Sequence, residues 1–280
     1  MSLAIQKVKR PVLRWHGGKW KLAPWIISHF PKHKVYTEVY GGAGSVLLRK
    51  PRSYAEIWND LDNDVVTLFR ILRDEEKAKE LKRVLELTPF ARQEFMEAYE
   101  PCEDEIESVR RFIILSFMGF GSDAVKKIVH TGFRANSTRS GTIPAHDWAN
   151  YPKCLEAFTA RLKGVCVEKR PALQVISQHD GPETLHYLDP PYVHETRKRT
   201  GQHGYTHEMT DQQHVELSEV LHQVKGMVVL SGYRGTLYED LYRGWETAEV
   251  SAHADGAGDR VEVLWFNEAA VIGKEQGKLL

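Results

Sequence analysis

The sequence predicts an α/β fold in which a mostly parallel sheet carries helices on both faces. Three observations predict it. Short apolar runs of strand length alternate with stretches of helical spacing at both ends of the chain. One run leads into a glycine-rich turn and then a helix, which is how nucleotide-binding units begin. Another run, residues 184–188, is apolar enough to be buried on both faces and stops at two prolines.

Composition places the chain among globular proteins. It has 280 residues, 42% hydrophobic and 27% charged, enough for one large domain or a core with a smaller insert. No apolar run approaches the ~20 residues of a membrane span, and the N-terminus lacks the core of a signal peptide. Cys102, Cys154 and Cys166 indicate neither a disulfide framework nor a zinc site. We therefore expect a cytoplasmic protein with no metal site.

The formal net charge of zero hides a segregation of charge along the chain. Residues 1–37 hold eight Lys or Arg and no acid, whereas residues 74–107 hold twelve acids and five bases. Residues 110–140 hold six bases against Asp123 alone. Basic blocks of this kind favour a face that contacts phosphates, although solvated surface charge is the plainer interpretation of any single block.

The first expected element follows a pair of glycines. Gly17 and Gly18 allow a tight turn or a close backbone approach, and they lie between Trp15 and Lys19. Residues 22–27 then have the spacing of a short helix.

A strand over residues 35–40 precedes the glycine turn of residues 41–45. Glycines there would let a ligand lie against bare backbone, facing the amides of the next helix. No Gly-Lys-Ser/Thr follows, so the turn is not a phosphate-binding P-loop. The third glycine of the dinucleotide fingerprint is also missing, which makes a nicotinamide oxidoreductase the least favoured enzyme class.

The second strand, residues 54–58, ends at Asn59 and Asp60. An acid about 20 residues past the glycines is where such folds hold a ribose hydroxyl pair. Asp62 and Asp64 are typical of the start of the next helix. The helical pattern of residues 74–120 interrupts the alternation and indicates an inserted layer or the start of a second domain.

Residues 117–148 are irregular and rich in Gly, Ser, Thr and basic side chains. Loops this long are usually functional, and hydroxyl, amide and guanidinium groups read base edges and phosphates. Alternation resumes with strands at 165–168, 184–188, 227–231, 245–250 and 261–267. Thr210 and Gln213 predict a capping box at the start of a helix, and the preceding loop carries glycines and bases suited to closing over a substrate.

The tetrapeptide Asp189-Pro190-Pro191-Tyr192 follows the most apolar strand. The prolines keep the backbone extended, so a carboxylate, a carbonyl and an aromatic ring meet at the carboxyl edge of the sheet. This set suits methylation of an exocyclic amine, whose two N–H groups need acceptors while its ring needs a stacking partner. The alternative is a strand followed by an ordinary proline-rich turn.

Four motifs occur in one order over nearly the whole chain: Arg14-Trp15-His16-Gly17-Gly18-Lys19, Glu38-Val39-Tyr40-Gly41-Gly42-Ala43-Gly44-Ser45, Asn59-Asp60 and Asp189-Pro190-Pro191-Tyr192. In the sequence and order of these motifs the chain resembles the Dam-type DNA adenine methyltransferases. In that family the cofactor motif comes first, the target-recognition region second and the catalytic motif third. The family's best-known target is GATC, and residues 120–144 lie where the family reads its target.

The resemblance implies a Rossmann-like S-adenosylmethionine-dependent methyltransferase sheet with helices on both faces. Residues 1–73 and 160–280 would form the catalytic domain, and residues 74–159 a mostly helical target-recognition insert. The implied reaction is site-specific transfer of a methyl group from S-adenosylmethionine to the N6 amine of adenine in duplex DNA. Transfer would be direct and in line, after the base has flipped out of the duplex.

The resemblance also implies roles for individual residues. The catalytic residues would be Asp189, Pro190 and Tyr192. The cofactor would be bound by Trp15, Lys19, Glu38, Tyr40, Gly41, Gly42, Gly44, Ser45, Asp60 and Asp189. DNA would be contacted by Arg14, Lys126, Lys127, Arg134, Asn136, Arg139, Arg197 and Lys198.

Several alternatives stay open. The tetrapeptide chemistry serves any exocyclic amine, so RNA or cytosine N4 is an alternative target, and a catalytically silent DNA-binding module is an alternative of another class. A cytosine-ring methyltransferase needs a nucleophilic cysteine after proline, but acids flank Cys102 and disfavour its thiolate. The sequence does not fix the recognition site or a companion restriction enzyme, and we expect a monomer.

Overall fold

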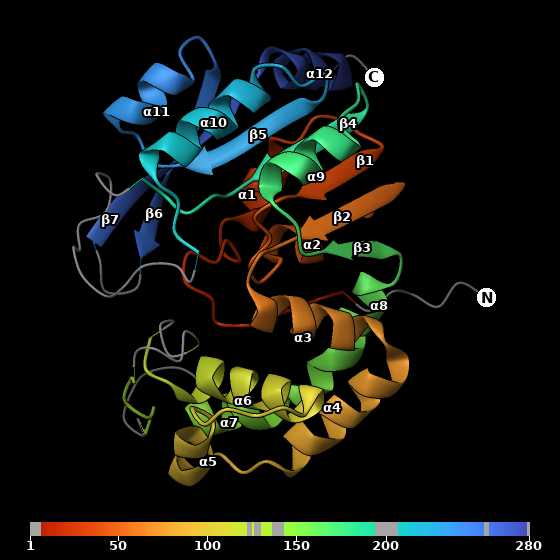
Figure 1. Cartoon of the computed structure of the whole chain (residues 1–280), viewed down its shortest axis with the longest axis vertical. Helices are drawn as coiled ribbons and strands as arrows, with labels where there is room; N and C mark the ends of the chain where they lie inside the picture. Colours follow the sequence, from red (N-terminus) through yellow and green to blue (C-terminus); the bar gives the residue numbers. More distant parts are fainter. Residues whose placement is uncertain are drawn as a thin grey trace. The chain divides into compact units, whose positions relative to one another are not determined.

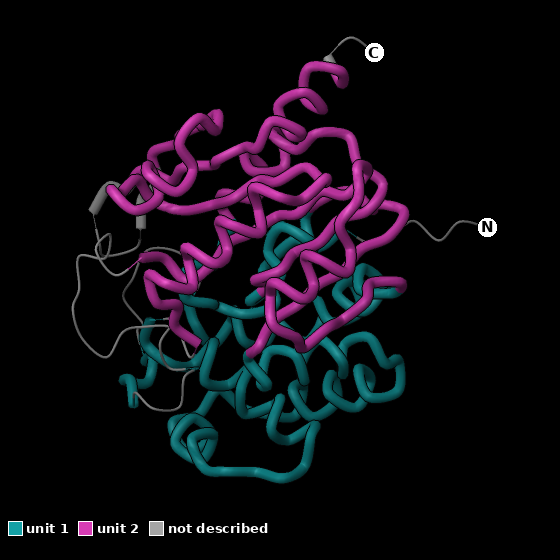
Figure 2. Tube along the Cα trace, turned by 45° about the horizontal axis from the view of Figure 1, so that its top comes forward, with its two compact units in different colours: residues 1–20, 42–49, 62–163 teal, residues 21–41, 50–61, 164–280 magenta. Residues whose placement is uncertain are grey.

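The structure is a computed structural model that describes residues 7–121, 125, 130–135, 143–193, 207–254 and 258–278. The chain forms two compact units, and both are discontinuous in sequence (Figures 1 and 2). Unit 1 comprises residues 1–20, 42–49 and 62–163, and unit 2 comprises residues 21–41, 50–61 and 164–280.

Unit 2 contains a seven-stranded sheet. Its strands are β1 (Val35–Glu38), β2 (Ala55–Asn59), β3 (Val165–Glu168), β4 (Thr184–Leu188), β5 (Met227–Gly232), β6 (Glu246–Ala254) and β7 (Gly258–Phe266). The order is β3-β2-β1-β4-β5-β7-β6. Strands β1 to β5 are parallel, whereas β7 is antiparallel to both β5 and β6. The mostly parallel sheet is confirmed; the sequence had not indicated the antiparallel direction of the last pair.

The strand order reverses between β1 and β4, which are neighbours in the sheet although they are far apart in the chain. In open α/β sheets, ligands bind outside the carboxyl ends of the strands at such a switch point. Glu38, the last residue of β1, is in register with Tyr187 of β4. The tetrapeptide therefore leaves the sheet beside the end of β1, at a carboxyl edge as the sequence predicts.

Helices cover the sheet of unit 2. They are α1 (Ala23–Ser28), α9 (Ala172–His179), α10 (Asp211–Leu221), α11 (Thr236–Leu241) and α12 (Glu268–Lys278). Figure 1 shows α9 and α10 in front of the sheet, where Ile176 and Leu217 pack in one core with Leu188 of β4. Successive strand residues face opposite sides, and on the other side Phe30, after α1, contacts the ring of Tyr187. Burial on both faces explains why β4 is apolar throughout.

Unit 1 is helical. Its elements are α2 (Ser45–Arg49), α3 (Asn63–Arg73), α4 (Glu75–Leu87), α5 (Arg92–Glu97), α6 (Glu105–Met118), α7 (Pro144–Asn150), the 3₁₀ turn η2 (Pro152–Cys154) and α8 (Leu155–Leu162). Helix α6 contacts α3, α4, α5 and α7. The N-terminal segment belongs to the same unit, because the Tyr151 hydroxyl donates to the Val12 carbonyl at 2.8 Å. The assignment of residues 74–159 to target recognition stays a prediction.

Two predicted helix starts are confirmed. Asp62 caps α3 by accepting a hydrogen bond from the Asp64 amide at 2.9 Å. Thr210 and Gln213 form the reciprocal capping box at the start of α10. Within the part of the chain that the structure describes, no helix has both the length and the apolar character needed to cross a membrane.

A histidine is fully buried between β1 and β4. The Nδ1 atom of His186 lies 2.8 Å from the Thr37 hydroxyl, and its Nε2 atom lies 3.6 Å from an Asp180 oxygen. Asp180 in turn accepts hydrogen bonds from the amides of Lys225 and Gly226 at 2.9 and 2.8 Å. Burial lowers the pKa of His186 to about 4, despite the attraction of Asp180, so the ring is neutral at pH 7.

We expect stability to fall as the pH drops from 6.5 towards 4. In that range the unfolded histidine binds a proton that the folded one excludes, and the folded pKa of about 4 makes this group worth roughly 3 kcal/mol at pH 7. Urea unfolding of the wild type and His186→Gln at pH 7 and pH 4.5 measures the difference. The exposed His146→Gln should keep the wild-type slope; an unchanged slope in His186→Gln would contradict the assignment.

Candidate active site

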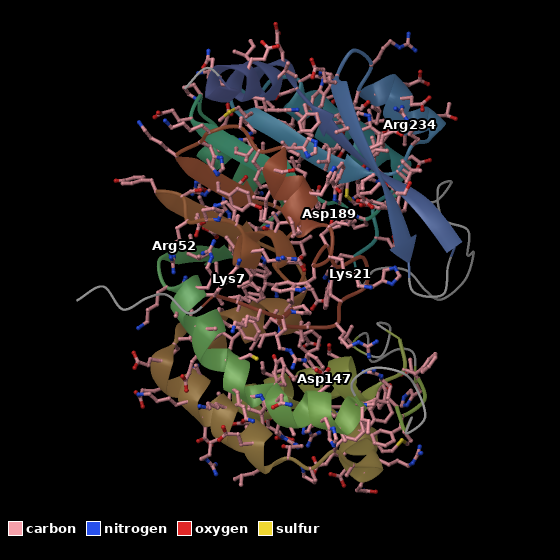
Figure 3. The ribbon with its side chains drawn as sticks, turned by 180° about the vertical axis from the view of Figure 1, so that it is seen from behind. Lys7, Lys21, Arg52, Asp147, Asp189 and Arg234 are labelled. Atoms are coloured by element: carbon pink, nitrogen blue, oxygen red, sulfur yellow. The ribbon has the colours of Figure 1, made fainter. Side chains whose placement is uncertain are left out.

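The site begins where β4 ends. Pro190 and Pro191 cannot donate to a ladder, so the chain leaves the sheet in extended form directly after Leu188. Asp189 is half-buried (labelled in Figure 3), and Tyr192 is only 5% exposed. The Tyr192 hydroxyl donates to Asp189 Oδ1 at 3.0 Å. Asp189 and Tyr192, which the sequence predicts to act together, are therefore hydrogen-bonded to each other.

A third side chain joins this pair from the antiparallel strand β7. The Tyr192 hydroxyl is also within hydrogen-bonding distance of Glu262 Oε1, so its single proton is donated either to Asp189 or to Glu262. The Ser231 hydroxyl on β5 donates to the same Glu262 oxygen at 2.7 Å. Sequence reasoning did not single out Glu262 or Ser231. The available signal was an isolated acid within the otherwise apolar run of residues 261–266.

Carboxylates gather around the end of the sheet. Glu38 is 2% exposed, and the Tyr36 hydroxyl donates to it at 2.7 Å. The pKa of the buried Tyr187 phenol is raised well above its usual value, first by burial and then by the charges of Asp189, Glu38 and Glu262. The predicted cofactor residues Glu38 and Asp189 therefore act on the same buried phenol. Among the described residues, no cluster of His, Cys, Asp and Glu has the arrangement of a metal site.

The glycine turn is shaped by tryptophan side chains. In unit 2, a Cβ atom at Gly41 would lie 2.1 Å from Nε1 of Trp58. In unit 1, Gly42 has a φ of +46°, and a Cβ there would lie 2.7 Å from Nε1 of Trp15. The rings of Trp15 and Phe112 meet edge to face, with centroids 6.2 Å apart. Packing against indole rings thus accounts for both glycines, and their predicted contact with the cofactor stays a prediction.

The other residues predicted to bind the cofactor have varied surroundings. Gly44 has a φ of +60°, Ser45 opens the short helix α2, and Lys19 is buried with Nζ donating to the Gly17 carbonyl at 3.1 Å. Tyr40 packs against the apolar core of unit 2, and burial raises the pKa of its phenol.

Asn59 is the structural anchor beside Asp60. It is 1% exposed, and its Nδ2 atom donates to the carbonyls of Val39 and Arg170 at 2.9 and 3.1 Å. Its Oδ1 atom accepts from the Arg170 amide at 2.9 Å. These bonds join the carboxyl ends of β1 and β2 to the segment after β3, which fixes where Asp60 leaves the sheet.

Two of the predicted DNA contacts are described, both in unit 1. The Arg14 amide donates to the Ser116 hydroxyl at 2.8 Å. The Arg134 side chain donates to the Phe117 carbonyl at 3.1 Å, and its amide pairs with the Met118 carbonyl at 2.8 Å. Gly119 and Phe133 form an antiparallel bridge beside it. The remaining predicted contacts lie outside the described residues: Lys126, Lys127, Asn136, Arg139, Arg197 and Lys198.

The predicted cofactor residues divide between the units. Those in unit 1 are Trp15, Lys19, Gly42, Gly44 and Ser45; those in unit 2 are Glu38, Tyr40, Gly41, Asp60 and Asp189. Within unit 1 the structure brings Trp15 to Gly42. Within unit 2 the charges of Glu38 and Asp189 both raise the pKa of the Tyr187 phenol.

The strand order, the antiparallel β6–β7 pair and the Asp-Pro-Pro-Tyr corner define a Rossmann-like methyltransferase. The family model of D12 class N6 adenine-specific DNA methyltransferases matches residues 15–254. The chain belongs to this family, and its activity is adenine-specific DNA methylation.

Curated relatives agree with this family. The chain is 22% identical over 276 residues to the type II methyltransferase M.MjaIII of Methanocaldococcus jannaschii, with 87% of this chain and 91% of the relative covered. It is 24% identical over 250 residues to the DNA adenine methylase of Salmonella typhi, with 85% of each covered. Over a shorter stretch of 67 residues, the chain is 37% identical to the DNA adenine methylase of Escherichia coli K12, with 24% of each covered.

We expect Gly41→Ala to destabilise the fold by about 1–3 kcal/mol, because the added methyl overlaps the Trp58 indole within a packed interior. Urea unfolding of the purified variant measures the loss. Gly181→Ala is the matched control, since its Cβ would meet its nearest neighbour at 3.7 Å and should leave the unfolding midpoint unchanged. Wild-type stability in Gly41→Ala would show that the loop yields to the indole.

Proposed function

We propose that the chain methylates the N6 amine of adenine at one short duplex sequence, with S-adenosylmethionine as the methyl donor. The observation that carries this proposal is the corner after β4, where Asp189 and Tyr192 are hydrogen-bonded at 3.0 Å beside the end of β1. Membership in an adenine-specific family supports the choice of base over cytosine, and DNA over RNA.

Asp189 and Pro190 prepare the amine for reaction. The lone pair of an exocyclic amine is delocalised into its ring, which makes the nitrogen a poor nucleophile. If the Asp189 carboxylate and the Pro190 carbonyl accept its two N–H groups, the nitrogen moves towards tetrahedral geometry and its lone pair is released. The prolines hold the backbone extended and so restrict the direction of that carbonyl. No covalent intermediate on the protein is required.

Tyr192 supplies the stacking surface for the flipped base. A base that leaves the duplex loses its stacking neighbours, and an aromatic ring in the pocket offsets part of that loss. In this structure Tyr192 is 5% exposed and meets the edge of Tyr233, with ring centroids 4.5 Å apart. Stacking on Tyr192 therefore requires a neighbouring group to withdraw from its face when the base enters.

The charges at the carboxyl ends of β1 and β4 suit the proposed cofactor. S-adenosylmethionine supplies an electrophilic methyl group on a positively charged sulfur, and its methionine part also carries an ammonium group. Glu38 and Asp189 place negative charge at the carboxyl ends of β1 and β4, which favours a cation there. We assign the ammonium group to these two carboxylates. Proximity and orientation of two bound reactants can remove ~7–11 kcal/mol of the barrier.

The basic blocks of the sequence are proposed to contact the DNA backbone. Arg14 and Arg134 are the described members of that set, and phosphate contacts position a protein on the duplex without reading its sequence. We propose that the enzyme acts as a monomer; a companion restriction enzyme would cleave the same, unmodified sequence.

The product identifies the reaction. DNA from cells that express the chain should contain N6-methyladenine at one short recurring sequence when modified bases are mapped genome-wide. Cells carrying an empty vector provide the background. Methylation confined to cytosine N4, to RNA, or to no base at all would refute the proposal.

We expect Asp189→Ala to lower the rate of methyl transfer at least about 10²-fold, because one of two acceptors on the reacting amine is lost. Transfer of labelled methyl groups from S-adenosylmethionine to duplex DNA measures the rate. The temperature of thermal unfolding should stay near that of the wild type, because Asp189 is half-buried at a strand end. The matched control is Asp240→Asn, an exposed acid paired with Arg243; a fully active Asp189→Ala would remove Asp189 from the mechanism.

A further inference from the structure

Glu262 is a buried carboxylate that the mechanism above does not use. It lies on β7 between Val261 and Val263 and is 3% exposed. Removing a carboxylate from water is costly unless hydrogen bonds replace the lost solvation. The donors to it include the Ser231 hydroxyl, at 2.7 Å, and the Tyr192 hydroxyl. The buried charge is thus directed at the aromatic residue of the catalytic tetrapeptide.

We propose that Glu262, supported by Ser231, is a positioning residue that fixes the ring of Tyr192 for the target base. The inference rests on the proposed function, because it assigns Glu262 a role in the same reaction. Glu262 acts through Tyr192 and does not touch the substrate.

The geometry gives Tyr192 two points of attachment. At one end, Pro191 restricts the backbone that precedes the tyrosine. At the other end, the hydroxyl contacts Asp189, just after β4, at 3.0 Å and Glu262 on β7, so carboxylates from two separate segments hold the tip of the ring. A side chain held only by its backbone can swing about its Cα–Cβ bond, whereas hydrogen bonds to the hydroxyl at the far end keep the ring in one place.

Ser231 strengthens this attachment. It is fully buried, and its hydroxyl lies 3.5 Å from the Tyr192 hydroxyl while donating to Glu262. Tyr192 and Ser231 therefore converge on a single carboxylate oxygen. Asp189 contacts the same Tyr192 hydroxyl, so the tyrosine tip and the acceptor of the reacting amine share one network.

A double-mutant cycle tests this role. Wild type, Glu262→Ala, Tyr192→Phe and the combined variant are compared for kcat and for KM with duplex DNA at saturating S-adenosylmethionine. We expect Glu262→Ala to lower kcat about 10- to 100-fold, the loss expected when a hydrogen bond to a charged group disappears. In the Tyr192→Phe background the same change should have little further effect, because the hydroxyl on which Glu262 acts is already absent.

Matched variants separate positioning from folding. Glu262→Gln keeps an acceptor oxygen for both hydroxyls and should recover most of the lost kcat. Ser231→Ala makes a smaller change at a buried position and should lower kcat less than Glu262→Ala does. In the Tyr192→Phe background this loss of kcat should also disappear. Ser231→Ala replaces Glu262→Ala in the cycle if Glu262→Ala does not fold. Glu249→Gln on the neighbouring strand β6, which removes an exposed carboxylate paired with Arg234, should behave as wild type.

A measurement without substrate keeps the inference distinct from the proposed function. In NMR spectra of the ligand-free protein, the Tyr192 hydroxyl proton should exchange slowly in wild type and rapidly in Glu262→Ala, with Tyr192→Phe identifying the signal. If wild type methylates no DNA, the proposed function fails, and this signal still decides whether Glu262 fixes Tyr192. A wild-type kcat in Glu262→Ala, equal losses with and without the Tyr192 hydroxyl, or an unchanged hydroxyl signal would each overturn the proposal.

Discussion

Pro190 and Pro191 cannot pair with a neighbouring strand, and the arrangement of the active site follows from that constraint. Because β4 is buried on both faces, it would otherwise run on into the sheet, and its side chains would keep alternating between two apolar layers. Termination at Leu188 instead places three groups of the tetrapeptide, a carboxylate, a carbonyl and a phenol, at the edge where the strand order reverses. The sheet supplies the rigidity and the prolines supply the direction.

The buried polar groups of unit 2 have two different uses. His186 on β4 is hydrogen-bonded to Thr37 on β1 through Nδ1, and its Nε2 atom lies 3.6 Å from an oxygen of Asp180. Tyr192, Ser231 and Glu262 form a chain that ends at Asp189, which is half-buried and faces the edge of the sheet. Hydrogen bonds offset the burial of the Thr37 hydroxyl and of the Glu262 carboxylate. The chain that ends at Asp189 is linked to the reacting groups, and that link gives its members a role beyond stability.

Local patterns in the sequence predicted local features well. The strands at both ends of the chain, the Asp62 cap and the Thr210 capping box depend on residues close together in sequence, and the tetrapeptide carries its own backbone restriction. The direction of β7 and the role of Glu262 were not predictable in this way. A carboxylate in a strand has no local sign of its partner, and its contact with Tyr192 spans 70 residues of chain. The same holds for Trp58, whose packing against Gly41 depends on the pairing of β1 with β2.

That packing has a consequence for how the chain can change over time. With 2.1 Å between the indole nitrogen and a methyl group on residue 41, the two positions do not accept substitutions independently. A lineage that first replaced Gly41 would pass through a destabilised intermediate, whereas one that first exchanged Trp58 for a smaller residue would open room for a side chain at 41. The permitted order of mutational steps is therefore set by this contact, independently of any ligand that the loop receives.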